Sequence, residues 1–162
     1  MTVISTTQDP EALTFSIVAE FSAPPSRVWQ VWSDARQLER WWGPPTWPAT
    51  FVAHDLSVGG RSHYFMTGPE GEQVHGWWQM LSVDEPKGLE FEDGFADESG
   101  RPAPEMPVTR GRVELTETTG GTRMTVTSHF ATADQMQQLV SMGMVEGMTG
   151  AMGQIDDLLA AA

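Results

Sequence analysis

The sequence contains no cysteine and few basic residues. The absence of cysteine excludes disulfide bonds, thiolate nucleophiles and cysteine-ligated zinc or iron–sulfur centres. Lysine and arginine together number 9 against 22 acidic residues, which gives a formal net charge of −13. A field of that sign repels phosphate backbones and anionic membranes. We therefore expect neither a nucleic acid nor a membrane as a partner.

Long hydrophobic runs are absent as well. Charges or glycines interrupt every run well before the ~18 residues that a membrane-spanning helix needs, and the N-terminus lacks the basic-then-apolar pattern of a secretory signal. We therefore expect a cytoplasmic protein. A chain of 162 residues is long enough for one domain with its own hydrophobic core. We expect a flexible N-terminal segment over residues 1–12 and a single domain over residues 13–160.

The first half of the chain predicts a strand, two short helices and then a series of strands. Apolar residues alternate over residues 13–21, which is the pattern of a half-buried strand. Pro24-Pro25 then favours the first turn of a short helix, and Asp34 can cap a second one that ends at Trp41-Trp42-Gly43-Pro44. From about residue 49 to residue 130, short alternating runs broken by glycines and prolines predict an antiparallel meander.

A turn centred near Glu70 would place Tyr64 opposite Gly76 and Ser62 opposite Trp78. The two faces of this hairpin then carry different residues, and both faces are aromatic. One face holds Ser62, Tyr64, Met66, Gly76, Trp78 and Met80, and the other holds His63, Phe65, His75 and Trp77. We expect the face with the tyrosine to point inward.

The C-terminal region predicts a long helix that begins after Thr132 or Asp134 and runs almost to the end of the chain. Its apolar stripe is rich in methionine, a flexible side chain that fills irregular space. Several glycines interrupt it, and each costs ~1 kcal/mol relative to alanine. They either allow close backbone contact with a neighbour or leave empty volume between the helix and the sheet.

These features, in this order, resemble a known family. The motifs are Leu-Glu-Arg-Trp-Trp-Gly-Pro at residues 38–44, Asp-Leu-Ser-Val-Gly-Gly at 55–60, a hairpin at 64–71, a turn and strand at 83–91, and the terminal helix with its glycines. The set resembles the bacterial proteins called activator of Hsp90 ATPase homologue 1-like, within the START-like (SRPBCC) superfamily that also holds polyketide cyclases and plant hormone-binding proteins. The similarity extends from about Thr14 to Leu159.

The resemblance implies an α+β, helix-grip (START-like, Bet v 1-like) fold. In that fold a curved antiparallel sheet wraps around a long C-terminal helix and encloses an apolar cavity, with two short helices after strand one. The resemblance does not imply chaperone activation, because eukaryotic activators join this domain to a separate N-terminal domain, and only about a dozen residues precede the first predicted strand. One departure is Gly147-Met148, where relatives commonly have glycine followed by tryptophan.

We expect the cavity to be the functional site, with Tyr64 as its polar handle. Its predicted wall consists of Trp41, Trp42, Tyr64, Met66, Trp78, Phe91, Met144, Met148 and Met152. Apolar pockets with a few polar groups are typical of small-molecule sites. The primary hypothesis is therefore the binding of a small hydrophobic or aromatic molecule, without a cofactor, metal or catalytic constellation.

Two other functions stay open. A cyclase or hydratase could act on a polyketide-like substrate in the same cavity, with Tyr64, His54 or Asp55 moving protons, an idea that rests on the superfamily alone. A protein-interaction module could instead use an outer aromatic patch at Phe65 and Trp77, and a homodimer is an open alternative.

Polar residues elsewhere have simpler interpretations. His63 and His75 lie diagonally on one face in the predicted register, and no carboxylate nearby completes a metal site. Asp55 precedes a glycine-rich turn, where an aspartate side chain commonly accepts hydrogen bonds from the backbone N–H groups of that turn. The acidic residues between 84 and 98 could attract a divalent cation, although Glu90 and Glu92 fit the solvated side of a strand better.

Overall fold

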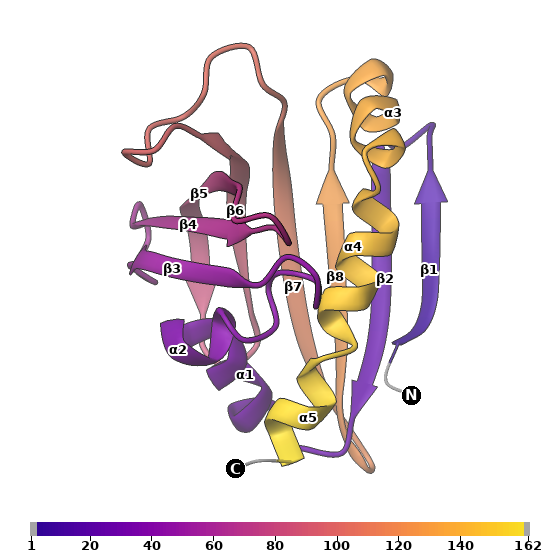
Figure 1. Cartoon of the computed structure of the whole chain (residues 1–162). Helices are drawn as coiled ribbons and strands as arrows, with labels where there is room; N and C mark the ends of the chain where they lie inside the picture. Colours follow the sequence, from indigo (N-terminus) through magenta and orange to yellow (C-terminus); the bar gives the residue numbers. More distant parts are fainter. Residues whose placement is uncertain (1–2, 161–162) are drawn as a thin grey trace.

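The computed structural model describes residues 3–160 and consists of one antiparallel sheet and a set of short helices (Figure 1). In chain order the elements are β1 Val3–Asp9, β2 Thr14–Phe21, α1 Pro25–Ser33, α2 Ala35–Leu38, β3 Ala49–His54, β4 Arg61–Thr67, β5 Gln73–Asp84, β6 Gly88–Ala96, β7 Val108–Thr118, β8 Gly121–His129, α3 Ala133–Ser141, α4 Met144–Met152 and α5 Ile155–Ala160.

The sheet has the strand order β1-β2-β8-β7-β6-β5-β4-β3. Strands β3 to β8 therefore form the predicted meander, and β2 pairs antiparallel with β8. Figure 1 shows the sheet curving so strongly that β3 and β4 run across the direction of β1 and β2. The C-terminal helices lie over one face of the sheet, beside β2, β7 and β8. The predicted α+β helix-grip fold is confirmed.

The predicted register of the β4–β5 hairpin is also confirmed. Tyr64 pairs with Gly76 and Ser62 pairs with Trp78. The tyrosine face points inward, since Trp78 is fully buried and Tyr64 is 7% exposed. The inward residues of this hairpin thus form part of the main hydrophobic core.

The N-terminal prediction was wrong for most of its length. Residues 3–9 form β1, which pairs antiparallel with β2 at the edge of the sheet, while residues 1–2 lie outside the described part of the chain. Asp9 then accepts hydrogen bonds from the backbone N–H groups of Glu11 and Ala12, both at 3.1 Å, which turns the chain into β2. The side chains from Ser5 to Asp9 are exposed, so β1 is held by its backbone ladder and carries no apolar alternation to reveal it. The two short helices consequently follow the second strand, not the first.

The C-terminal helix is divided into three segments, α3, α4 and α5. Thr132 is the N-cap of α3, where its hydroxyl accepts from the Gln135 N–H at 3.1 Å. Gly143 has φ of +89°, a left-handed conformation that ends α3 and begins α4. Within residues 3–160, each helix is too short or too polar to cross a membrane.

Two glycines of this region provide a matched test of helix conformation. A Cβ added at Gly147 or at Gly143 would meet no atom within 4 Å, but only Gly143 has a positive φ. We expect Gly147→Ala to raise the free energy of unfolding by ~1 kcal/mol through helix propensity. Gly143→Ala should lower it by ~1 to 2 kcal/mol through backbone strain. Urea denaturation measures both, and equal effects of the two substitutions would contradict the assignment of the break to Gly143.

Candidate functional site: an apolar cavity under the C-terminal helix

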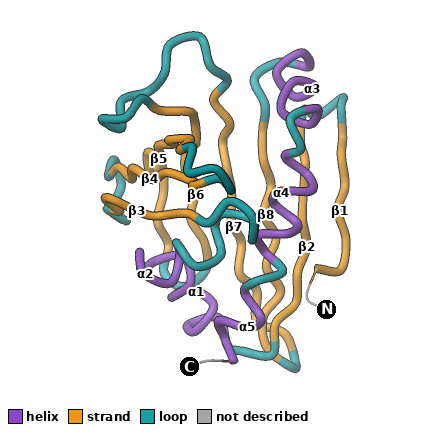
Figure 2. The backbone as a smooth tube through the Cα atoms, viewed as in Figure 1, coloured by secondary structure: helices purple, strands orange, loops and turns teal. Residues whose placement is uncertain are grey.

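A cavity of about 340 Å³ lies between the concave face of the sheet and α4. Strands β4 to β8 provide one side of it, and α4 together with the end of α3 provides the other. The segment between α2 and β3 closes one flank, and Figure 2 shows this loop passing beside α4. Gln154 holds the loop there, because its side-chain amide donates to the Gly43 carbonyl at 2.7 Å.

The structure brings most of the predicted site residues together. The cavity wall includes Trp41, Trp42, Tyr64, Met66, Phe91, Met144, Met148 and Met152. Trp78 does not reach the wall: it is fully buried behind it, with its ring stacked on Phe91 at 4.2 Å between centroids. The prediction of Trp78 as a lining residue was therefore wrong, because neighbouring aromatic rings cover it.

The two tryptophans in the loop after α2 have different roles. Trp41 is fully buried, and its indole N–H donates to the Val31 carbonyl at 2.8 Å, so it fixes the loop to α1. Trp42 is only partly buried and packs edge-on against Trp78 at 4.8 Å and Tyr64 at 6.1 Å. Trp41 thus belongs mainly to the core, whereas Trp42 forms a wall of the cavity.

Glycines on the strands make room for the large rings of the wall. A Cβ at Gly76 would collide with the Tyr64 ring, and a Cβ at Gly111 would approach the Phe91 ring to 2.8 Å. Both rings therefore lie across a neighbouring strand. On the helix, Gly147 faces the cavity with open space around it, so empty volume rather than close backbone contact accounts for this glycine.

The main polar feature of the cavity is a hydrogen bond between two side chains. The Tyr64 hydroxyl donates to Asp93 Oδ1 at 3.0 Å. Burial raises the pKa of Asp93 to about 7, while the Tyr64 hydroxyl and the Trp78 indole N–H nearby oppose this rise only in part. Burial first, and the Asp93 charge second, raise the pKa of the Tyr64 phenol well above its usual range. The cavity therefore contains a carboxyl group that titrates near neutrality.

Asp93 was missed as a site residue, although the sequence carried a signal for it. It lies among the acidic residues between 84 and 98. However, Leu89 and Phe91 point inward on β6, and the same alternation continues to Asp93, directly opposite Trp78 on β5. A charged residue in an inward position of a strand should have been treated as a candidate functional group.

Two indole N–H groups beside this pair lack partners. Trp42 Nε1 and Trp78 Nε1 are buried and have no hydrogen-bond acceptor among the described residues. Buried donors are normally satisfied, and an unsatisfied one costs about 1–3 kcal/mol. Both side chains lie close to the Tyr64 hydroxyl, and they oppose in part the rise in the pKa of that phenol.

The other candidate proton-transfer residues lie outside the cavity wall. His54 contacts the Ser62 hydroxyl at 2.7 Å with Nδ1 and the Trp32 carbonyl at 2.9 Å with Nε2, and burial lowers its pKa. Asp55 accepts hydrogen bonds from the Ser57 N–H and hydroxyl, as expected for a turn-forming aspartate. Among Tyr64, His54 and Asp55, therefore, only Tyr64 lines the cavity.

The outer face of the hairpin is covered rather than exposed. Trp77 is only 6% exposed, with the Arg61 guanidinium 5.5 Å from its ring centroid, so the expected exposed patch of Phe65 and Trp77 is not present. His63 Nε2 lies 2.9 Å from His75 Nδ1, which confirms the predicted diagonal pair. Burial lowers the pKa of His63, and His75 adds to this effect. The described residues contain no group of three potential metal ligands.

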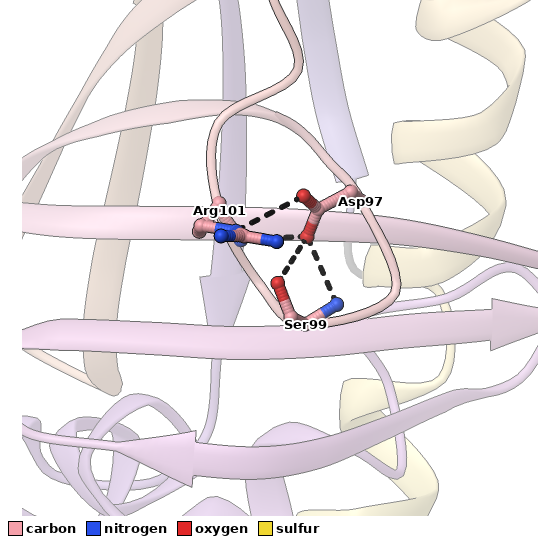
Figure 3. Close-up of polar contacts among 3 residues, drawn as sticks. All are labelled: Asp97, Ser99 and Arg101. Carbon is pink, nitrogen blue, oxygen red and sulfur yellow. Dashed lines mark hydrogen bonds and ion pairs between the residues drawn. The ribbon is translucent and has the colours of Figure 1, made fainter.

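Asp97 and Glu90, two other acidic residues of this region, are used for local structure. Asp97 accepts from the Ser99 hydroxyl at 2.7 Å and from the Arg101 backbone N–H at 3.0 Å, as Figure 3 shows. These hydrogen bonds, with the Arg101 side chain at 3.3 Å, lower the pKa of Asp97 to about 2. Glu90 pairs with Arg110 at 3.1 Å on the outer side of the sheet. Apart from Asp93, these acidic residues thus stabilise a strand and its turn.

The elevated pKa of Asp93 predicts how its charge affects stability. The folded protein holds this proton more tightly than the unfolded chain, so ionisation of Asp93 destabilises the fold as pH rises from its ordinary value of 3.8 through about 7. The full effect is at most about 4 kcal/mol, and solvent in the cavity reduces it. We expect the stability of Asp93→Asn relative to wild type to improve between pH 4 and pH 8 in urea denaturation. Glu92→Gln, on the other face of β6, should show no such trend.

Comparisons with known proteins agree with this architecture. Residues 22–160 match the model of the family described as "Activator of Hsp90 ATPase homolog 1-like protein". A protein from Arthrobacter aurescens is 54% identical, with 99% of this chain and 94% of that chain covered and a TM-score of 0.94. Ms6760 from Mycobacterium smegmatis is 49% identical, with 99% and 98% covered and a TM-score of 0.90.

More distant solved structures share the fold. The AHSA1 protein from Silicibacter pomeroyi is 23% identical, covers 91% of this chain and 98% of its own, and has a TM-score of 0.73. A search of the curated proteins finds no match. The family model and the two close relatives together establish that this chain belongs to the activator of Hsp90 ATPase homologue 1-like family.

Proposed function

We propose that this protein binds a small hydrophobic or aromatic molecule in the cavity between the sheet and α4. The observation that carries the proposal is an apolar space of about 340 Å³ between the sheet and α4, lined mainly by aromatic and methionine side chains. Small-molecule sites range from about 300 to 1,000 Å³, so this cavity suits a molecule of about two fused rings. Flexible methionines on α4 can adjust to the shape of such a guest.

The test places an indole where the guest would lie. Met148→Trp should fill part of the cavity and weaken the binding of naphthylethanol, a neutral apolar probe, by at least about tenfold. Glu146→Trp is the matched control, because it adds the same ring to the same helix at an exposed position. Isothermal titration calorimetry measures the affinity, and thermal melting verifies that both variants fold. Unchanged affinity in Met148→Trp would count against this cavity as the binding site.

A second candidate function is an enzyme of the cyclase or hydratase kind, acting on a polyketide-like substrate in the same cavity. The specific observation in its favour is the hydrogen bond between Tyr64 and Asp93 within an apolar space. A carboxyl group with a pKa of about 7 is suited to accept and return a proton at neutral pH. The tyrosine hydroxyl beside it could donate to a carbonyl oxygen as an enol forms.

Benzoylacetone, an aromatic β-diketone, tests this second function through its rate of keto–enol exchange, followed by ultraviolet absorbance. If the pair is catalytic, Tyr64→Phe should reduce the protein-dependent rate about a hundredfold while the affinity for benzoylacetone stays within about twofold. An unaltered rate would remove the tyrosine from the mechanism. A wild-type rate equal to that in buffer would rule out this reaction.

A protein-interaction role is less well supported than the two cavity functions, because Trp77, one of the two aromatic residues expected to form the exposed patch, is buried. Concentration-dependent self-association of the purified chain in sedimentation experiments would support the protein-interaction role.

A further inference from the structure

The cavity has a charge pattern that indicates which kind of apolar molecule it would hold. Asp93 is the one acidic side chain of the described wall, and no lysine or arginine lines the cavity. An anionic guest would therefore meet a carboxyl group and no lysine or arginine to compensate the two negative charges. The overall formal charge of −13 also favours cations in the surrounding solution.

The surroundings of Asp93 suit a cation in a second way. Trp42, Tyr64 and Phe91 line the same cavity as Asp93, and the Tyr64 hydroxyl contacts its carboxyl directly. An ammonium group is attracted to the faces of aromatic rings within about 6 Å. A carboxylate and several rings around one apolar space therefore offer both contacts that an alkylammonium can make.

The hydrogen bonding of the carboxyl leaves a place for this group. The Tyr64 hydroxyl donates to Oδ1, and no hydrogen bond to Oδ2 is present among the described residues. The Trp78 indole N–H lies close enough to lower the pKa of the carboxyl, but it makes no hydrogen bond of normal geometry. A neutral guest would leave Asp93 either protonated or ionised without a counter-charge. A protonated amine supplies both a donor for Oδ2 and the missing positive charge.

We propose that the guest of this cavity is an apolar molecule with one protonated amine, whose nitrogen binds Asp93 beside Trp42 and Tyr64. This inference rests on the proposed binding function and names the chemical class of its ligand. The pKa of Asp93 supports it, because the carboxyl is partly protonated near neutrality without a guest and releases its proton when an ammonium binds.

Three probes with the same apolar body test the inference by calorimetry at pH 8: naphthylethylamine, naphthylethanol and naphthylacetate. We expect wild type to bind the amine at least about tenfold more tightly than the alcohol, with the acid weakest. Asp93→Asn should remove this preference and leave the affinity for the alcohol within about twofold. Glu92→Gln, which loses the same charge on the outer face of β6, should keep the preference.

The pH dependence of wild type provides a second measurement that does not depend on the folding of a variant. Besides Asp93, the titratable residues of the described wall are Tyr64 from β4 and His75 from β5, whose ring contacts His63 on the outer face of the hairpin; the described parts of β7, β8, α3 and α4 contribute none. Between pH 5.5 and pH 8 the affinity for the amine should rise about tenfold as Asp93 ionises, and the affinity for the alcohol should not. A rise that persists in Asp93→Asn would assign the effect to His75 and overturn the inference.

The outcomes separate this inference from the function on which it rests. Equal affinity of wild type for the amine and the alcohol would overturn the amine preference and leave the apolar binding site intact. Failure of all three probes to bind would overturn both. Tighter binding of the alcohol than of the amine would also overturn the amine preference and would indicate a neutral guest.

Discussion

The packing of Trp42 and Phe91 around Trp78 is the interaction on which the rest of the domain depends. Trp78 stacks on Phe91 at 4.2 Å and meets the edge of Trp42 at 4.8 Å, so one cluster joins the loop after α2 to strands β5 and β6. Aromatic pairs of this kind contribute ~0.5 to 1.5 kcal/mol each beyond the area they bury. The cluster fills one end of the concave face of the sheet. The other end lies under α4, where the inward residues are glycine and methionine, and it stays hollow.

The hollow end persists because the C-terminal helix is unable to fill it. A glycine at position 147 leaves open space where any other residue would project a side chain, and the helix is broken at Gly143, which also lines the cavity. Each feature carries a cost in helix stability. The aromatic cluster and the eight-stranded ladder offset that cost elsewhere, which leaves the domain folded around an internal space.

The same geometry gives Asp93 its unusual chemistry. The carboxyl is placed by a strand, β6, in the row of inward residues that otherwise forms the core, and its burial shifts its pKa toward neutrality. A carboxylic acid in this setting responds strongly to any charge that enters the cavity. Binding of a guest and protonation of Asp93 are consequently linked, so the pH of the solution should affect which guests are held.

The sequence by itself determined the pattern of the sheet, because side-chain period and turn residues are local properties. The alternation in the β4–β5 hairpin and its Gly-Pro-Glu-Gly turn were enough to predict the pairing of Tyr64 with Gly76 and the inward face. Only the tertiary structure decided that Trp78 is covered while Trp42 is not, and that β1 forms an edge strand, since these depend on neighbours distant in sequence. The Tyr64–Asp93 contact likewise joins residues 29 positions apart, and the burial that raises the pKa of Asp93 exists only once the helix covers the sheet.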